Sequence, residues 1–270
     1  MRRWFRLLLA CVPLLTSCQA GGRSMQASEL FEPPMAALLQ SIQKGDEATA
    51  KHQLSQGLNL NIQGKEGVTP LLWLVYETQN KEAVKLALKL GADPNYKDGS
   101  GDSIVNRVSG VRDPDWLRVV LDAGGDPNSI GRRRQPAIFS AIGEERWADI
   151  KLLVERGADV NLKDGPGRNS ALYAAYLDKY EIVYWLIEQG ADTTIYDDTG
   201  SDLAFSVEDS LSIMSPQSPQ YPWALKVKQL LQQRGVEFPP LSPAEVRARR
   251  AKGEPLRGVG SGYCWPVCRC

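Results

Sequence analysis

The sequence predicts an all-α solenoid in which about five to six copies of a helix-turn-helix unit are stacked on one another. The main observation is a phrase of Gly, a small residue, Asp and, two residues later, Asn or Thr, which begins every 33 residues at Gly91, Gly124, Gly157 and Gly190. A weaker copy begins 34 residues earlier, at Gly57. A fixed period of this length indicates one supersecondary unit repeated along the chain, so function is expected on an extended surface.

Each of these glycines follows an amphipathic helix. The positions seven, four and three before the glycine are apolar, which is the i, i+3, i+4 stripe of a helix with one buried face. Glycine is favoured where a helix stops because it adopts the left-handed cap conformation at little cost. The stripe residues are Val84, Ala87 and Leu88; Leu117, Val120 and Leu121; Ile150, Leu153 and Val154; and Val183, Leu186 and Ile187.

A second short helix precedes each amphipathic one. Its clearest copies are residues 69–76 and 170–176. Thr69 followed by Pro70 is a favourable helix start, because threonine caps the first turn and proline fits it. Turn-rich segments such as residues 163–167 separate one glycine from the next helix pair. The predicted unit is therefore a helix, a second helix and a hairpin-like loop.

Two motifs of this unit resemble the halves of the ankyrin-repeat consensus: Gly67-Val68-Thr69-Pro70-Leu71 and Gly157-Ala158-Asp159-Val160-Asn161. The resemblance covers about residues 33–238 and implies an ankyrin-repeat domain. We expect five helix pairs and a sixth, stretched pair that ends near Gly235. Terminal repeats are expected to be atypical because each exposes one side to water.

Some segments depart from the repeat pattern. The sixth unit carries 12 extra residues, which we assign to a loop within residues 208–221. In the third unit, residues 102–107 replace the usual helix opening, so its first helix is the least regular one. The register predicts a core position for four aromatic residues, namely Trp73, Phe139, Tyr173 and Trp185.

The N-terminus is expected to direct the chain to the cell envelope. Residues 1–17 combine a basic start with an apolar run too short to span a bilayer, as in a secretion signal. Leu15-Thr16-Ser17-Cys18 resembles the lipobox of bacterial lipoproteins, which implies lipid attachment at Cys18. The same resemblance, with Gln19 next, implies an outer-membrane lipoprotein that faces the periplasm. The alternative is an ordinary signal peptide with an incidental cysteine.

The composition agrees with a globular body on a tether. Charged residues make up 24% of the chain and hydrophobic residues 43%, as in globular proteins. Cleavage after residue 17 removes three arginines and leaves 29 basic against 32 acidic side chains, which does not favour a nucleic-acid-binding protein. Residues 18–32 are small and polar, and we expect them to form a flexible tether between the lipid and the fold.

The sequence offers no recognisable catalytic constellation, so we expect a binding protein without cofactor or metal, and not an enzyme. Any His-based metal site or catalytic triad would depend on the single histidine, His52, whose register favours a partly buried helix position. No phosphate-binding glycine loop with Lys and Ser or Thr occurs. Acidic pairs such as Glu144-Glu145 fall in connecting turns, where solvated charge is expected.

The ankyrin resemblance implies a protein partner, because ankyrin proteins bind other proteins with their loop tips and the exposed face of the first helix. The matching positions include arginine and tyrosine, which binding hot spots favour, and a basic patch would steer an acidic partner. The alternative is a solvated loop that carries arginine for solubility. The predicted partner-binding residues are Lys65, Glu66, Tyr76, Glu77, Asp102, Arg132, Arg133, Arg134, Arg168, Tyr176 and Asp198. The same register adds Val68, Gly99, Ser100, Ile142, Pro166, Leu177, Thr199 and Ser201.

Residues 239–270 are predicted to contain a short basic helix and a tail with cysteines. Ser242-Pro243-Ala244-Glu245 has the form of a capping box. In an oxidising compartment one pair among Cys264, Cys268 and Cys270 could close a disulfide and leave one thiol over. A three-cysteine metal site without histidine is less favoured, and a disordered tail is the open alternative.

Together these features favour a lipid-anchored protein that works by binding another protein. Lipid-anchored periplasmic ankyrin proteins resemble immunity proteins, which neutralise toxic effectors such as secreted phospholipases by covering the active site. We expect this function. The alternative is a scaffold or chaperone for an envelope enzyme, such as a periplasmic catalase. An enzyme acting on envelope polymers is a third class.

Overall fold

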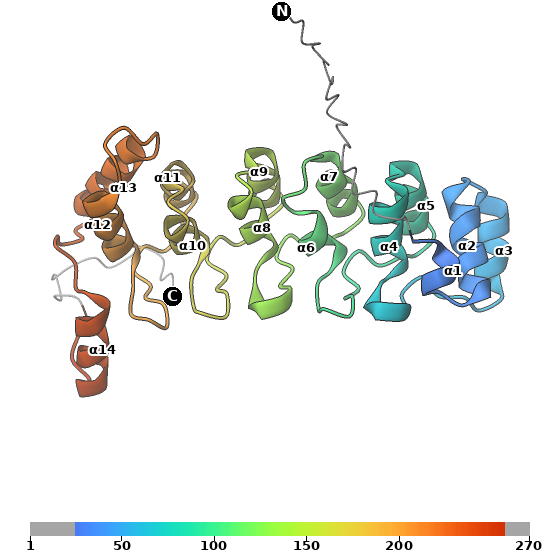
Figure 1. The fold of residues 1–270 in the computed structure, drawn as a ribbon, viewed down its shortest axis with the longest axis horizontal. Coiled ribbons are helices and arrows are strands. Elements are labelled where there is room, and N and C mark those ends of the chain that lie inside the picture. The colour runs from blue at the N-terminus through green and yellow to red at the C-terminus, as the bar shows by residue number, and fades with distance from the viewer. Residues whose placement is uncertain (1–24, 257–270) are drawn as a thin grey trace, which may run out of the picture.

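The computed structural model describes residues 25–256, which form a single row of stacked helix pairs (Figure 1). Within these residues no β-strand forms, and one isolated bridge joins Ile130 to Pro136. The predicted all-α solenoid is therefore confirmed. Cys18 and the cysteines at 264, 268 and 270 lie outside the described residues, so the predictions of a lipid anchor and of a disulfide stay predictions.

The described chain contains six helix pairs, which we number as units 1 to 6, and each pair ends before the expected glycine. The pairs are α2 (Pro33–Gln43) and α3 (Glu47–Ser55); α4 (Pro70–Trp73), continued by η2 (Leu74–Thr78), and α5 (Lys81–Lys89); α6 (Ile104–Val108) and α7 (Asp115–Asp122); α8 (Ala137–Gly143) and α9 (Trp147–Glu155); α10 (Ser170–Tyr176) and α11 (Tyr180–Glu188); and α12 (Leu203–Ile213) and α13 (Tyr221–Gln233). Four further elements are α1 (Ala27–Leu30), η1 (Lys65–Gly67), η3 (Arg132–Arg134) and α14 (Pro243–Lys252).

The loops between units all project to one side of the row (Figure 1). We call them the finger loops, and we call the surface that they form with the first helices the inner face. Backbone bonds join neighbouring fingertips: the N–H of Gly99 donates to the carbonyl of Gly67 at 2.9 Å, and that of Gly165 donates to Arg133 at 3.1 Å. The finger loops are residues 64–68, 98–102, 131–135, 164–168 and 197–201.

The repeated Gly-x-Asp-x-Asn phrase joins consecutive units by hydrogen bonds. The side-chain oxygen of Asn95 accepts from the N–H of Asp126 at 2.8 Å, and its amide donates to the carbonyl of Gly124 at 3.0 Å. Three other asparagines make the same two bonds with the next unit, namely Asn61, Asn128 and Asn161. The series ends at Thr194, whose bonds within the described chain stay in its own turn. The asparagine that recurs with the sequence period thus forms the hydrogen bonds that join each unit to the next.

The single 34-residue spacing is absorbed inside the first helix of unit 2. The segment 69–91 is one residue longer than its counterpart 169–190. The extra residue lies in the π-helical turn Leu74–Thr78, where the Thr78 hydroxyl donates to the Leu74 carbonyl at 2.6 Å. Single π turns of this kind arise when one residue is inserted into an α-helix and are frequent at functional sites.

The chain from Met25 onward belongs to the folded body. The indole N–H of Trp73 donates to the Met25 carbonyl at 2.8 Å, and the Glu77 carboxylate accepts from the Met25 N–H at 2.9 Å. The predicted tether of residues 18–32 is therefore wrong for its second half. Apolar side chains explain the difference, because those that follow Met25 are buried, namely Ala27, Leu30 and Phe31.

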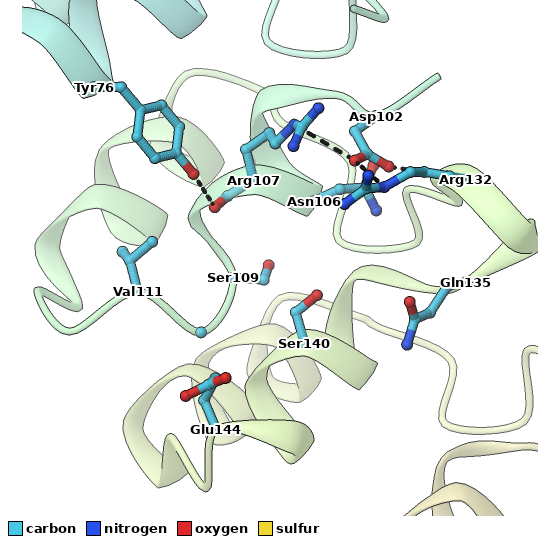
Figure 2. Close-up of a pocket in the computed structure, with 11 residues that line it drawn as sticks. Tyr76, Asp102, Asn106, Arg107, Ser109, Val111, Arg132, Gln135, Ser140 and Glu144 are labelled. Carbon is cyan, nitrogen blue, oxygen red and sulfur yellow. Dashed lines mark hydrogen bonds and ion pairs between the residues drawn. The ribbon is translucent and has the colours of Figure 1, made fainter. Parts of the chain in front are cut away.

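Unit 3 has a short first helix. Helix α6 has five residues, whereas α8 and α10 each have seven. After Ser109 the chain turns at Gly110, whose φ is 94°. A Cβ at Gly110 would lie 2.8 Å from the carbonyl oxygen of Ser140, so this turn packs directly on α8. Figure 2 shows Ser109, just before this turn, near Ser140 of α8.

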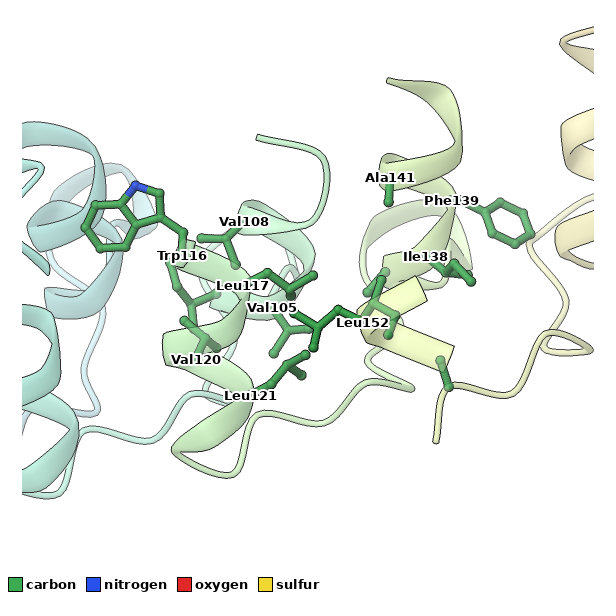
Figure 3. Close-up of a cluster of buried hydrophobic side chains, with 14 of the residues drawn as sticks. Val105, Val108, Trp116, Leu117, Val120, Leu121, Ile138, Phe139, Ala141 and Leu152 are labelled. Atoms are coloured by element: carbon green, nitrogen blue, oxygen red, sulfur yellow. The ribbon is translucent and has the colours of Figure 1, made fainter. Parts of the chain in front are cut away.

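The core is a continuous hydrophobic cluster along the row. Figure 3 shows part of it, where Leu117 and Val120 of α7 gather with Val105 and Val108 of α6. All four side chains are fully buried. Burying one such side chain contributes roughly 1.5–3 kcal/mol. Because every unit shares this cluster with its neighbours, the stability of one unit depends on the next.

Of the four aromatic residues predicted in the core, two are buried and two are half-buried. Trp73 and Phe139 are buried, whereas Tyr173 and Trp185 are half-buried. Tyr173 stacks on Phe139 with ring centroids 4.3 Å apart. His52 is exposed on α3, so its predicted partial burial is wrong, because α3 belongs to the terminal unit and buries only Ala50.

The loop inside unit 6 is shorter than predicted, and a helix follows this unit. Residues 208–213 continue helix α12, and only residues 214–220 form the loop, so the loop is shorter than the assigned 208–221. The predicted basic helix forms as α14, with a capping box between Ser242 and Glu245. Its Val246 is buried against Gly200 of the last finger loop. No helix of the described chain has the length and apolarity needed to cross a membrane.

Candidate inner-face binding site

A cleft of about 300 Å³ opens on the inner face where α6 is short. Tyr76 of unit 2 borders one side, and Ser140 of α8 and Glu144, the residue that follows α8, border the other. Figure 2 shows Tyr76 pointing toward Arg107, with Asp102 between Arg107 and the arginine of the next finger loop. The lining residues are Tyr76, Asp102, Asn106, Arg107, Ser109, Gly110, Val111, Arg132, Gln135, Ser140 and Glu144.

Arg107 is fixed by its own finger loop. Its Nε and Nη2 donate to Asp98 at 2.8 and 2.6 Å, and Nη2 also donates to the Ser100 hydroxyl at 2.7 Å. Burial on its own would raise the pKa of Asp98, but the bonds from Ser100, Arg107 and two backbone N–H groups outweigh it and hold this pKa below its ordinary value. The Asp98 carboxylate stays ionised at neutral pH, and it neutralises the charge of Arg107 within the fold.

Asp102 joins two units and does not face solvent, although it was predicted as a partner-binding residue. It is 7% exposed. Its Oδ2 lies 3.4 Å from Nε of Arg107 and 3.2 Å from Nε of Arg132, and its Oδ1 accepts from the Arg132 N–H at 2.9 Å. Asp102 therefore positions Arg132 at the cleft. Its prediction as an exposed contact was wrong because register alone does not show this ion pair.

Arg168 is also committed to the fold. It donates to Asp164 at 2.9 and 2.6 Å, and its guanidinium carbon lies 5.3 and 5.2 Å from the rings of Tyr173 and Tyr176. The Tyr176 hydroxyl donates to Asp197 at 2.6 Å. Arg168 was predicted to bind the partner together with the arginines at 132–134, but its charge is paired within the fold. Tyr176 remains 42% exposed and still offers an aromatic edge on the inner face.

The other three arginines lie on the finger loop of unit 4. All three are exposed, and Arg132 stays 62% exposed in spite of its ion pair with Asp102. The side chains of Arg133 and Arg134 make no hydrogen bond or ion pair with any residue in the range 25–256. Both have left-handed backbones, with φ of 55° and 57°. Each such non-glycine residue costs roughly 1–2 kcal/mol.

Of the remaining predicted residues, some are exposed and others are bonded or buried within the fold. Lys65 and Glu66 are exposed on the finger loop of unit 2, and Asp198 is exposed on that of unit 6. Glu77 bonds the N-terminal segment and Ile142 is fully buried, so neither is free on the surface. Ile142 was misplaced because α8 turns that position toward the core.

Tyr76 lies between two hollows of the surface. Tyr76 is 48% exposed, and its hydroxyl donates to the Arg107 carbonyl at 3.0 Å. On its other side a wider depression of about 930 Å³ reaches Lys81 and Trp116. Sequence reasoning did not find Arg107, Ser140 or Glu144 as site residues. The available signal was the irregular stretch 102–114, which marks where the inner face is open.

Asp149 of α9 is a buried carboxyl behind the turn at Gly110. Its Oδ2 accepts from the Gly110 N–H at 3.3 Å and lies 3.9 Å from Arg146 Nε, while Oδ1 has no hydrogen-bond partner in the described chain. Burial raises the pKa of Asp149 above its ordinary value, although the Gly110 bond and the Arg146 charge act in the opposite direction. Residues 25–256 contain no group of three His, Cys, Asp or Glu residues arranged to hold a metal ion.

Comparison with family models gave no match. The chain is similar to Protein PhlB of Serratia liquefaciens, with 26% identity over 184 residues that make up 66% of this chain and 80% of PhlB. It is 27% identical to a putative ankyrin repeat-containing protein of Treponema pallidum (strain Nichols), over 45% of this chain and 41% of that protein. It also matches the E3 ubiquitin-protein ligase KEG of Arabidopsis thaliana at 29% identity, but spans only 6% of that ligase.

Among solved structures, the ankyrin repeat domain of Bcl-3 superposes with a TM-score of 0.59. The match covers 74% of this chain and 86% of the Bcl-3 chain at 22% sequence identity. At this identity the likeness concerns the fold. The row of helix pairs, the finger loops and the asparagine bonds between units agree with it. The chain therefore has the ankyrin-repeat fold.

Proposed function

We propose that the protein binds a toxic effector, for example a secreted phospholipase, with its inner face and blocks it, as an immunity protein does. The observation that carries this proposal is the cleft on the inner face, next to a finger loop on which Arg133 and Arg134 have no side-chain partner among residues 25–256. A concave site with an exposed aromatic rim and unpaired arginines suits a protruding segment of another protein, because tyrosine and arginine dominate binding hot spots.

Side chains inside the cleft are also available. Those of Ser140 and Glu144 make no hydrogen bond or ion pair with any described residue, so a partner would not have to break internal bonds to reach them. Arg107 and Asp102 are held by each other and by Asp98, which keeps the floor of the cleft preorganised. A rigid floor lowers the entropy lost on binding.

We further propose that the protein is a lipoprotein of the outer membrane, attached at Cys18 and facing the periplasm. The support is the signal-like segment 1–17 and the lipobox-like residues that end at Cys18. Six residues separate Cys18 from Met25. A chain of this length spans at most about 25 Å, so an anchor there would keep the body close to the membrane. Labelling with radioactive palmitate tests the attachment, and an unlabelled product would contradict it.

The binding proposal is tested by affinity purification from detergent-solubilised envelope, followed by mass spectrometry. We expect one dominant protein, and we expect the double variant Arg132→Glu, Arg134→Glu to lose it while its helical circular dichroism stays unchanged. The control is Arg118→Glu, Lys151→Glu, which makes the same charge change on exposed positions of α7 and α9. An inner-face variant that binds as tightly as the parent would contradict the site.

The activity of the recovered partner decides between two functions. An immunity protein suppresses that activity when it is bound, so adding the purified chain should abolish turnover at a one-to-one ratio. A partner that keeps or gains activity in the complex would instead fit the scaffold or chaperone of an envelope enzyme. Both outcomes leave the inner-face contact in place.

A further inference from the structure

We propose that Arg134 forms the main contact of the inner face with its partner, and that the partner presents a cluster of carboxylates to the finger loop of unit 4. This inference rests on the proposed function and adds the chemistry of the partner.

Arg134 stands where the other finger loops have glycine. Counted from the first helix that follows, its counterparts are Gly67, Gly101, Gly167 and Gly200, with φ between 73° and 89°. Arg134 adopts the same left-handed region with φ of 57°, and Arg133 before it has φ of 55°. Glycine occupies this region without steric penalty, whereas a residue with a Cβ does not. The loop itself would therefore be more stable with glycine at 134.

Two of the three positive charges of this loop, those of Arg133 and Arg134, are not neutralised by any residue in the range 25–256. Three finger loops begin with an aspartate that accepts N–H groups of its own loop, namely Asp98, Asp164 and Asp197. In unit 4 that position is Gly131, and a Cβ there would lie 2.2 Å from a carboxylate oxygen of Asp102, so a larger residue would displace the Asp102 side chain. The loop thus carries three arginines and no carboxylate of its own.

The neighbouring arginines show the contrast. Arg107 and Arg168 lie within 2.6 Å of Asp98 and Asp164, and Arg132 lies 3.2 Å from Asp102. Arg133 and Arg134 have no such partner among the described residues. An exposed guanidinium has a planar fork of N–H donors that matches a carboxylate, and pairing at an interface makes it a strong contact. An acidic partner surface fits this chemistry and would also be steered by it.

The test compares Arg134→Gly with a matched control, Gln79→Gly. Gln79 is exposed, uncharged and left-handed with φ of 50°, so its replacement removes the same backbone strain without a change in charge. We expect both variants to raise the melting temperature by about 2–4 °C. The probe is the purified protein recovered from the envelope with the parent chain. We expect Arg134→Gly to weaken its binding at least tenfold, and Gln79→Gly to leave the Kd unchanged.

Competition identifies the chemistry of the partner. Polyglutamate should displace the recovered protein from the parent chain, whereas polylysine at equal ionic strength should not. Displacement by neither polymer would overturn the carboxylate assignment. An unchanged Kd for Arg134→Gly, or a melting temperature that falls, would overturn the role of Arg134. If Arg134→Gly binds normally but the double variant at 132 and 134 still loses the partner, the role of Arg134 is overturned and the proposed function stands. If the parent chain recovers no partner, both the proposed function and the role of Arg134 are overturned.

Discussion

The side-chain oxygen of Asn128 accepts a hydrogen bond from the backbone N–H of Asp159 at 2.7 Å, while its amide donates to the carbonyl of Gly157 at 3.1 Å. One side chain of unit 4 thereby satisfies a donor and an acceptor at the start of the next loop. Because these backbone groups would otherwise lack a partner in the fold, the bond fixes the spacing between units.

Replacement of Asn128 by alanine is expected to lower the free energy of unfolding by about 1–3 kcal/mol, since two backbone groups lose their partners. Urea denaturation followed by circular dichroism measures this loss. The matched control is Thr194→Ala, at the same place in the phrase, because Thr194 bonds only its own turn within the described chain. Equal losses in both variants would show that the bond between units does not contribute.

Gly110→Ala is expected to destabilise the chain by roughly 1–3 kcal/mol and to disturb the cleft, because its Cβ would meet the backbone of α8 at Ser140. The control is Gly124→Ala in the same unit. The φ of Gly124 is 90° and no atom lies within 4 Å of a Cβ added there, so this variant introduces backbone strain without a steric clash. Thermal denaturation compares the two variants. A smaller loss at 110 than at 124 would mean that the turn does not pack on α8.

Arg107→Ala is expected to lower the free energy of unfolding by about 1–3 kcal/mol, because the buried Asp98 loses its two hydrogen bonds from the guanidinium. The folded-state pKa of Asp98 is depressed, so its stabilising contribution is present above its ordinary pKa and is lost as the pH falls through the folded-state value. The variant should therefore lose less stability on acidification than the parent. NMR titration of Asp98 should show a raised pKa in the variant, and an unchanged pKa would contradict the pairing.

Asp149 should show the opposite dependence on pH. Its folded-state pKa is raised, so the carboxyl costs nothing below its ordinary pKa, and stability falls as the pH rises toward the folded-state value. Asp149→Asn should match the parent at about pH 3 and exceed it at pH 7, because the amide still accepts from Gly110 and carries no charge. Chemical denaturation across that pH range measures the difference. A variant that is less stable than the parent at pH 7 would show that the Arg146 charge outweighs burial.

The scaffold could be predicted from the sequence because its signals are local and repeated. The stripe residues such as Leu117 and the phrase at Asn95 recur in every inner unit, and each copy supports the others. The terminal segments gave weaker signals. Phe31 and the residues before it were expected in a tether because a short apolar segment at the edge of a repeat array has no period to reveal it.

The candidate site could be predicted only in outline. Register located Arg133 and Arg134 on a fingertip, and the structure finds them exposed. Register could not show that Arg168 is neutralised by Asp164, because a variable position can serve either a partner or the scaffold. The cleft itself depends on how far α6 extends, and helix ends are set by competing turns rather than by periodicity.

Hydrogen–deuterium exchange of the chain with and without its recovered partner is the most direct measurement of inner-face binding. We expect slower exchange in residues 105–111 and 131–144, around the cleft, and no change in α5, α7 and α11 on the far side of each unit. Protection confined to those second helices, with residues 105–111 and 131–144 unchanged, would contradict binding through the inner face.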